Sequence, residues 1–446
     1  MPSPLTTSSN PRLSAFALLT ALATLGLLAA GGLVTSHGAG MAVPDWPNSY
    51  GYNMFFFPFS QWAGGIFYEH THRLFASLVG LLTTILALWL YGTKARPWMR
   101  HLGLVLLAAA LGALIAWPRR WSDALVVGLT GAALFTSSFA WPRCEPSPRW
   151  LRRLGLAAFL AVVLQGLLGG LRVVLFQDAI GIFHATLAQL FFVLVCALAL
   201  FTSRWWQNSL GSPFCAHAPR LPILVTATTL LILVQLILGA CMRHQHAGLA
   251  IPDFPLAYGK LWPPMDAASV ALYNQHRLET VSLNPITSFQ IGLQMAHRIV
   301  AALILAAVAG CAWQSLRRFG ARSALGKLAL VWLGLVLTQS LLGAITIWSS
   351  KAADIATAHV LGGALCLALG TLECLLCFRQ FMPASMTVAQ ALEPSSEVSG
   401  PECRVSSVGC RVSRGGSLFP RHSTLDPRPS TLAPRPSALS RQFGRP

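Results

Sequence analysis

Long apolar runs separated by short polar segments dominate the first 380 residues of the chain. Each run approaches or exceeds the roughly 20 residues that an α-helix needs to cross a bilayer. The alternating segments of about ten residues that are typical of transmembrane β-barrels are absent from the sequence. We therefore expect an all-α polytopic membrane protein with about ten membrane-spanning helices, at 13–33, 71–91, 101–117, 123–140, 152–175, 182–203, 220–241, 290–313, 324–348 and 354–377.

The composition agrees with this pattern. The 446 residues are 54% hydrophobic and only 10% charged, against roughly 25% charged in an ordinary globular protein. This excludes a soluble globular protein. The net charge of +18 would suit nucleic-acid binding, but the Lys and Arg residues lie between the apolar runs and in the C-terminal tail. We therefore expect no nucleic-acid partner.

The basic residues indicate how the chain crosses the membrane. Fifteen Lys and Arg residues up to Arg379 fall in alternate segments on one side of the predicted spans, and six fall on the other side. The positive-inside rule places the richer side in the cytoplasm. We expect a multi-pass protein of the cell (inner) membrane with both termini cytoplasmic, beginning with a short cytoplasmic segment, 1–12.

The C-terminal residues 383–446 differ from the rest. They are rich in Pro, Ser and Arg and contain a crude repeat, DPRPSTLAPRPSALS. Such a segment has too few apolar residues to bury a core, so we expect a disordered cytoplasmic tail. The ten Cys residues are absent from the two longest polar loops, 34–70 and 242–289, and we expect no structural disulfide.

Four sequence blocks occur twice in the same order. HGAGMAVPDWPNSYGY from His37 matches HAGLAIPDFPLAYGK from His246, and EHTHRLFASLVGLL from Glu69 matches QMAHRIVAALILAA from Gln294. QGLLGG matches QSLLGA, and GIFHATLAQLFF matches IATAHVLGGALCL. An ordered match of this kind indicates two homologous halves, each with four core helices.

The halves span 13–203 and 220–377, and both begin with a helix running outward, so we expect parallel pseudo-symmetric four-helix bundles. The first half is longer. His72 and His184 are 112 positions apart, whereas their counterparts His297 and His359 are 62 apart. The difference of 50 residues matches an inserted transmembrane hairpin at 101–140, which leaves the orientation of the later helices unchanged.

His72, His184, His297 and His359 are the candidate ligands. Each lies in the first turns of a span that runs inward, so all four are expected at a similar depth near the outer face. Ionisable residues inside membrane spans are costly and usually functional. A single such histidine bonded to a carbonyl of a neighbouring helix would be unremarkable, but two pairs repeated in two halves favour a pair of ligand sites.

Two histidines from two helices suit the axial ligation of heme iron in a helical bundle. Zinc would need a third or fourth ligand, which the sequence does not provide at this depth. Gly166, Gly169, Gly170 and Gly343 are small residues that would fit beside a flat macrocycle, although glycines in membrane helices also serve helix packing.

The halves differ next to the first histidine of each pair. Glu69 lies one helical turn before His72, and its counterpart before His297 is Gln294. A carboxylate can exchange protons and an amide cannot, so the first half is expected to be catalytic. The alternative is a helix-start carboxylate favoured by the helix dipole. Arg73 and Arg298 would pair with heme propionates or extend to the lipid headgroups.

At these residues the chain resembles the heme A synthase family, over roughly 13–377 without the hairpin. The resemblance implies an oxidoreductase that converts the C8 methyl of heme O to a formyl group, giving heme A for cytochrome c oxidase. It implies that His297 and His359 hold a heme b cofactor for electron transfer. By the same resemblance, His72 and His184 flank the iron of the substrate heme and Glu69 is the catalytic carboxylate.

The resemblance further implies a heme O synthase as a partner. We also expect contact with membrane lipid and with an electron carrier, while a homo-oligomer stays an open alternative. Some bacterial members carry a Cys pair in the outer loops, which this chain does not have. Two other functions remain open from the residues alone. A quinol-linked di-heme cytochrome b would need no Glu69, and a transporter with parallel repeats would place polar residues near the midplane.

Overall fold

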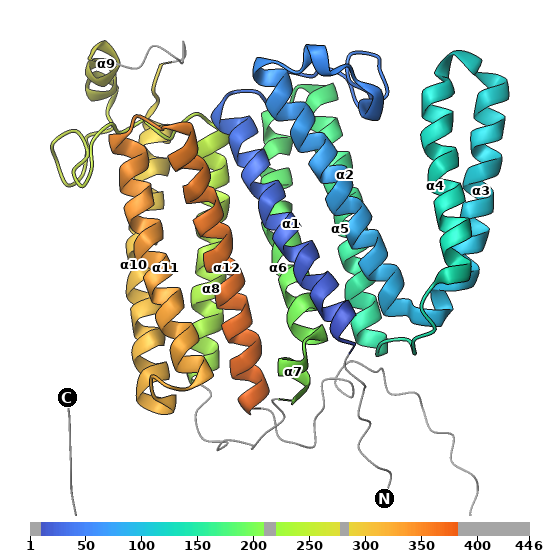
Figure 1. Ribbon diagram of the computed structural model, residues 1–446. Helices are drawn as coiled ribbons and strands as arrows, with labels where there is room; N and C mark the ends of the chain where they lie inside the picture. Colours follow the sequence, from blue (N-terminus) through green and yellow to red (C-terminus); the bar gives the residue numbers. More distant parts are fainter. Residues whose placement is uncertain (1–9, 209–219, 277–284, 382–446) are drawn as a thin grey trace, which may run out of the picture. The chain divides into compact units, whose positions relative to one another are not determined.

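The computed structural model describes residues 10–208, 220–276 and 285–381 (Figure 1). Two short helices, α7 (Arg204–Asn208) and α9 (Ala267–Gln275), and four 3-10 turns connect the main elements. The predicted tail 383–446 lies outside the described residues. The long helices are α1 (Pro11–Ser36), α2 (Gly64–Tyr91), α3 (Ala95–Ala116), α4 (Trp121–Ala140), α5 (Arg149–Leu175), α6 (Asp178–Thr202), α8 (Arg220–His244), α10 (Ser288–Phe319), α11 (Ala324–Trp348) and α12 (Ala353–Phe381).

The described segments contain nine apolar helical stretches long enough to cross a membrane. One of them, Gly64–Ala116, comprises both α2 and α3, which are joined by a single 3-10 turn, Gly92–Lys94. The ten predicted spans therefore correspond to the ten long helices. This confirms the all-α polytopic membrane fold.

Local sequence signals explain where several helices begin. The Asn10 side chain accepts hydrogen bonds from the first backbone N–H groups of α1, and Ser323 does the same for α11. Thr287 and Gln290 form a capping box at the start of α10. Such caps satisfy N–H groups that the helix itself leaves unpaired. In contrast, α2 begins after Ala63 with no side-chain cap.

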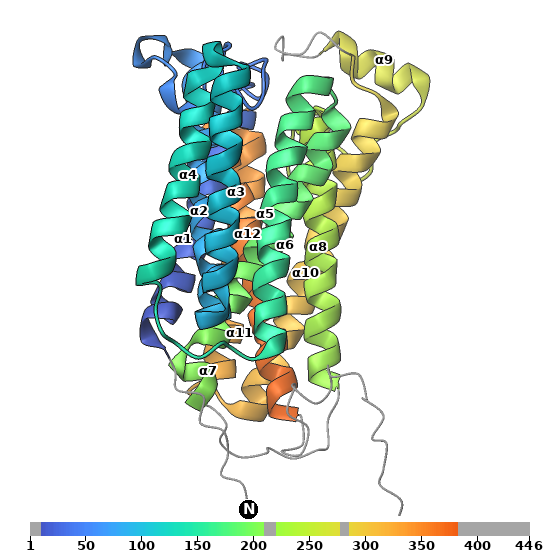
Figure 2. The same ribbon diagram turned by 90° about the vertical axis from the view of Figure 1, so that its right-hand side faces the viewer.

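Two four-helix bundles stand side by side, α1, α2, α5 and α6 in one and α8, α10, α11 and α12 in the other (Figures 1 and 2). Each has its own apolar core, which includes Leu86 and Leu198 in the first bundle and Trp332 in the second. α1 and α8 run in the same direction, as expected for parallel repeats. The prediction of two parallel bundles is confirmed.

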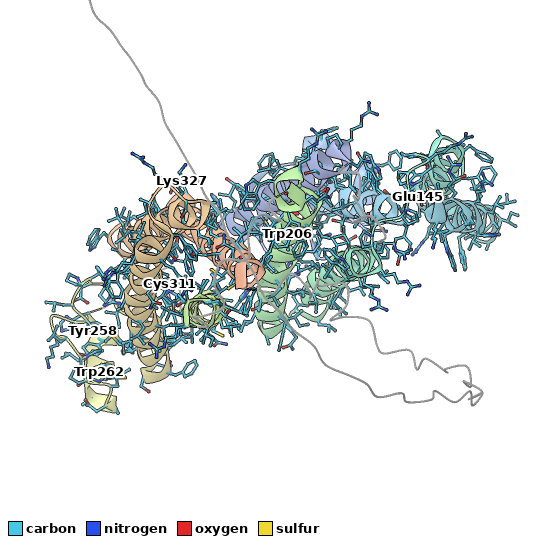
Figure 3. All side chains as sticks on the ribbon, turned by 90° about the horizontal axis from the view of Figure 1, so that it is seen from below. Glu145, Trp206, Tyr258, Trp262, Cys311 and Lys327 are labelled. Atoms are coloured by element: carbon cyan, nitrogen blue, oxygen red, sulfur yellow. The ribbon has the colours of Figure 1, made fainter. Side chains whose placement is uncertain are left out.

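The bundles meet through α1 and α6 of the first half and α8 and α12 of the second. Phe192, Ala364 and Ala368 form a small buried cluster at this junction. Seen from below (Figure 3), Cys311 lies among the helices of the second bundle, and Glu145 lies near the hairpin at the other side. The seven described cysteines are free thiols.

The predicted hairpin is formed by α3 and α4. These helices pack closely because Gly103 and Gly131 face each other, and a Cβ on either would come within 2.9 Å of the other's carbonyl oxygen. Backbone hydrogen bonds close the neck of the hairpin, from Thr93 N to Cys144 O at 3.1 Å and from Ser147 N to Leu90 O at 2.9 Å. At its far end, Asn53 Nδ2 donates to Asp123 Oδ1 at 2.8 Å.

We call the end of the bundles that carries loops 37–63 and 245–276 the loop face. The largest difference from the predicted spans occurs here, because α2 begins at Gly64 rather than at 71. Its first two turns contain Glu69 and His70, whose polar side chains interrupt the apolar pattern on which the prediction depends. The short helix α9 was also not predicted; it begins at the capping residue Asp266.

Candidate functional site

The four candidate histidines lie within about three turns of the loop face, because α2, α6, α10 and α12 all begin there. His72 and His184 belong to the first bundle, and His297 and His359 belong to the second. The structure therefore places them at a similar depth, as the sequence predicted.

Each imidazole packs against a glycine on the preceding helix of the same bundle. A Cβ built on the glycine would come within 3.0–3.4 Å of the ring Cε1, so a larger residue would displace the ring. Gly31 and Gly239 were not anticipated. The distances from the built Cβ to Cε1 are 3.0 Å for Gly31 and His72, 3.3 Å for Gly169 and His184, 3.4 Å for Gly239 and His297, and 3.2 Å for Gly343 and His359.

The other predicted glycines have different surroundings. Gly166 faces open space, and Gly170 packs tightly against the Trp46 ring. Of the four predicted glycines, Gly169 and Gly343 therefore make room for imidazole rings and Gly170 makes room for a loop residue. The open space beside Gly166 leaves the prediction that it fits beside a flat macrocycle untested.

The surroundings of the ring nitrogens distinguish ligand histidines from structural histidines. In all four residues Nδ1 is buried and has no hydrogen-bond partner among the described residues. No Nε2 of the four forms a hydrogen bond with the described part of the chain. With Nδ1 enclosed and Cε1 against the glycine, the free edge of each ring is the one that carries Nε2. A structural histidine bonded to a neighbouring carbonyl is therefore not what the structure shows.

In the second pair, the imidazole rings of His297 and His359 face each other. The ring centroids of His297 and His359 are 6.5 Å apart, with an angle of 63° between the planes. An imidazole nitrogen binds a metal at about 2 Å, so this separation suits one metal atom between the two rings. Unpaired buried imidazoles from two helices fit axial heme ligation. His72 and His184 are close enough to interact electrostatically, but they form no such ring contact within the described residues.

Glutamine side chains hold three of the four histidine-bearing turns. Gln165 Nε2 donates to the backbone oxygen of His184 at 3.0 Å, and Gln339 Nε2 to that of His359 at 2.7 Å. Gln235, which was not anticipated, donates to the backbone oxygen of His297 at 2.9 Å. Each glutamine precedes its packing glycine by four residues. This Gln-x-x-x-Gly spacing is a sequence signal that would have identified Gln235 and Gly239.

Two loops of nearly identical structure cover the sites. Asp45 accepts the backbone N–H groups of Tyr50 at 2.7 Å and Gly51 at 2.8 Å, and Asp253 accepts those of Tyr258 and Gly259 at the same distances. Gly51 has φ +78° and Gly259 has φ +74°, a left-handed conformation that glycine adopts without strain. The recurring Pro-Asp and Tyr-Gly pairs of the sequence thus encode one loop fold used twice.

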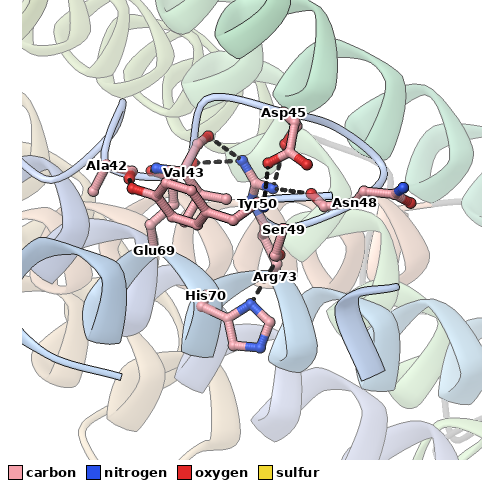
Figure 4. Close-up of polar contacts among 9 residues, drawn as sticks. All are labelled: Ala42, Val43, Asp45, Asn48, Ser49, Tyr50, Glu69, His70 and Arg73. Atoms are coloured by element: carbon pink, nitrogen blue, oxygen red, sulfur yellow. Dashed lines mark hydrogen bonds and ion pairs between the residues drawn. The ribbon is translucent and has the colours of Figure 1, made fainter. Parts of the chain in front are cut away.

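Glu69 is buried and bound on both carboxylate oxygens (Figure 4). Oε2 accepts the backbone N–H of Val43 at 2.8 Å, and Oε1 accepts from Arg73 Nη2 at 2.7 Å. The same guanidinium donates to the carbonyl oxygens of Val43, Asp45 and Asn48. Glu69 is therefore not a helix-start residue held by the dipole. It joins α2 to the covering loop.

The second half repeats this arrangement without the charge. Gln294 Oε1 accepts the backbone N–H of Ile251 at 2.7 Å, as Glu69 does for Val43. Arg298 donates to the carbonyl oxygens of Asp253 at 2.6 Å and Leu256 at 2.9 Å. Glu69 and Gln294 thus occupy equivalent positions, and only the first forms an ion pair, the one salt bridge found among the described residues.

One contact between the halves was not predicted from the sequence. Arg243, near the end of α8, donates through Nη2 to the carbonyl oxygen of Gly32 and to Ser36 Oγ of α1, both at 2.6 Å. Ser36 in turn lies 3.3 Å from Thr357 Oγ1 of α12. These contacts join the two bundles on the loop-face side, between the two histidine pairs. A lone arginine near a span end carries no sequence signal for such a role.

The chain is similar to known proteins over most of this fold. A family described as cytochrome oxidase assembly protein matches residues 115–371. A heme A synthase of Geobacillus kaustophilus is 25% identical over 352 residues, covering 77% of this chain and 84% of that protein. Heme A synthases of Methylobacterium nodulans and Rhodopseudomonas palustris are 30% and 28% identical, covering 55% and 63% of this chain and 68% and 74% of those proteins.

The family match spans more than half of the chain and includes both histidines of the second pair and His184. The relatives share the name heme A synthase, and each of the two parallel bundles of the structure holds two imidazoles whose Nδ1 atoms have no hydrogen-bond partner among the described residues. The chain belongs to the cytochrome oxidase assembly protein family, that of the heme A synthases.

Proposed function

We propose that this chain is a heme A synthase that oxidises the C8 methyl of heme O to a formyl group in the biogenesis of cytochrome c oxidase. The observation that carries the proposal is the difference between two otherwise equivalent sites. Glu69 and Gln294 accept hydrogen bonds from equivalent loop N–H groups, those of Val43 and Ile251, but only the first is a carboxylate. A pure electron carrier with two equivalent hemes has no use for this difference.

His297 and His359 are the proposed axial ligands of a resident heme b. Their ring separation and free Nε2 edges support this assignment. When bound, the heme supplies one-electron transfer. The chain's own contribution is to hold both rings in place, through Gly239 and Gly343 behind the rings and through Gln235 and Gln339 at the backbone.

His72 and His184 are proposed to flank the iron of the substrate heme O. Glu69, one turn before His72, is the proposed catalytic carboxylate. Val43 N–H and Arg73 fix the direction of its two oxygens, and a carboxylate at this position is the group that can exchange a proton during oxidation of the methyl group. The amide of Gln294 cannot do this.

The two arginines next to the first histidine of each pair are the proposed propionate contacts, and they differ in capacity. A guanidinium has two hydrogens on each terminal nitrogen. Each terminal nitrogen of Arg73 donates two hydrogen bonds, whereas each terminal nitrogen of Arg298 donates one. Arg298 therefore retains donors for a carboxylate of the resident heme, and Arg73 would have to exchange a loop carbonyl for one.

The proposed membrane topology is supported by the charge distribution, and the proposed partners are supported by the family. We propose a cell (inner) membrane location with both termini in the cytoplasm and the loop face outside. A heme O synthase would deliver the substrate, and an electron carrier would exchange electrons with heme b. Exposed apolar side chains along the spans, such as Leu111 and Ile115, suit contact with lipid.

The proposal is tested by expressing the full chain with a heme O supply, extracting the hemes and identifying them by mass. We expect heme A from the wild type and at least a ~100-fold loss of heme A in Glu69→Gln, because general acid–base groups contribute about that much or more. Gln294→Glu is the matched control and should still produce heme A. Heme b alone, two per chain and unaffected by Glu69→Gln, would instead indicate the electron carrier.

A further inference from the structure

Four copies of one packing unit hold the four histidines, and one copy is incomplete. In three copies a glutamine four residues before the glycine donates to the histidine's backbone oxygen. In the copy that holds His72, the residue four before Gly31 is Leu27. Leu27 packs into the apolar core of the first bundle and has no donor. No side chain in the described residues donates to the backbone oxygen of His72.

The start of α2 also lacks a side-chain hydrogen bond that the equivalent helix α10 has. α10, the equivalent helix of the second half, begins with the Thr287 and Gln290 capping box, and its Gln290 Nε2 also reaches Gln245 O at 2.7 Å. α2 begins without a side-chain cap. Its loop-face end is connected instead to the loop, through Arg73 and Glu69. Near its histidine, α2 is therefore hydrogen-bonded through side chains to a loop, whereas α10 also receives a side-chain hydrogen bond from its neighbouring helix, through Gln235 of α8.

From this difference we infer that His72 is the releasable ligand of the first site, and that Gln165, Gln235 and Gln339 are positioning residues that keep the other three histidines bound. The inference rests on the proposed function, because it takes the four histidines as heme ligands. His72 would have to leave before a further ligand could bind at the first site. Its release would break only the bond from Nε2 to the iron, leave the electron pair on the neutral imidazole and change no oxidation state.

The inference has a direct chemical probe. Carbon monoxide binds a ferrous heme only where an axial position opens, and its binding is visible in the optical spectrum. We expect the heme-loaded, reduced full chain to bind carbon monoxide at the first site and to resist it at the second. The measurement needs no turnover, so it reports on the ligands and not on the activity.

Leu27→Gln would complete the fourth unit and should lower the affinity of the first site for carbon monoxide by about three- to five-fold, which is what one interhelical hydrogen bond in a membrane provides. Leu22→Gln is the matched control, because it makes the same change on an exposed position of α1. Gln235→Leu is the reciprocal variant and should create carbon monoxide binding at the second site, even where Leu27→Gln does not fold.

The outcomes separate the two proposals. Equal carbon monoxide binding by wild type, Leu27→Gln and Gln235→Leu, in protein that still makes heme A, overturns the inference and leaves the proposed function intact. A response of Leu22→Gln equal to that of Leu27→Gln also overturns it. A correctly folded chain that binds no heme overturns both.

Discussion

α2 and α10 are equivalent helices that carry the same histidine and arginine, yet they are secured in different ways. α10 has a capping box, an uncharged Gln294 and a glutamine from α8 at its histidine. α2 has no side-chain cap, a buried ion pair and a leucine in place of that glutamine. The difference teaches that two copies of a ligand site can keep the same link to a covering loop and differ in its charge and in the hydrogen bonds from the neighbouring helix.

The strongest way to sharpen this comparison is to remove one histidine from each pair. We expect His359→Ala to lose the resident heme and all heme A formation, since both depend on the second site. His184→Ala should keep the resident heme and lose only heme A. Heme extracted per mole of purified chain measures both, and equal loss of heme from the two variants would contradict separate roles for the sites.

The next effect concerns the arginines. Arg73→Gln should lower the free energy of unfolding by about 3 kcal/mol, because it leaves the buried carboxylate of Glu69 without its partner. Arg298→Gln should cost only about 1–2 kcal/mol, since it removes two hydrogen bonds and strands no charge. Denaturant unfolding in detergent, followed by Trp fluorescence, compares them. Similar losses would mean that the ion pair does not distinguish the halves.

A smaller effect tests how the halves are joined. Arg243→Gln removes two hydrogen bonds from α8 to α1 and should reduce stability by about 1–2 kcal/mol. Lys327→Gln changes an exposed basic residue and should have almost no effect. The same unfolding measurement applies, and an unchanged Arg243→Gln protein would show that apolar contacts alone hold the bundles together.

The smallest expected difference is between the two loops. Asp45→Ala and Asp253→Ala each remove the acceptor for a Tyr-Gly turn and should each cost about 1 kcal/mol. Because the turns have the same geometry, the losses should be equal within error. A larger loss for Asp45→Ala would show that the charged link between Arg73 and the loop extends to the turn itself.

Much of the fold was predictable because membrane-spanning helices consist of long runs of apolar residues. The ten spans, the two halves and the inserted hairpin all follow from hydropathy, charge and repeats. The start of α2 was not predictable in this way, since its first two turns carry polar residues that the loop covers. Glu69 was recognised as different from Gln294, but its binding to Val43 required the fold of a loop 26 residues earlier.

The histidines were predictable because ionisable residues are rare in spans. Their supports were predictable only in part, because the Gln-x-x-x-Gly spacing marks Gly239 but not Gly31. Gly31 resembles any other small residue of a membrane helix, and only the structure shows that a ring lies against it. Arg243 has no counterpart in the repeat, and its partners Gly32 and Ser36 lie about 210 positions away. Contacts between halves are invisible to a comparison that looks only for what the halves share.

The closed neck of the hairpin has a consequence for protein engineering. Backbone hydrogen bonds donated by Thr93 and Ser147 hold the two ends of the insertion between α2 and α5 together. In the second half, the equivalent helices α10 and α11 are joined directly by the four residues 320–323. The hairpin therefore enters and leaves at one point of the scaffold. Excising it and grafting the short turn in its place should yield a minimal eight-helix enzyme, in which the contribution of α3 and α4 to partner binding is measured by their absence.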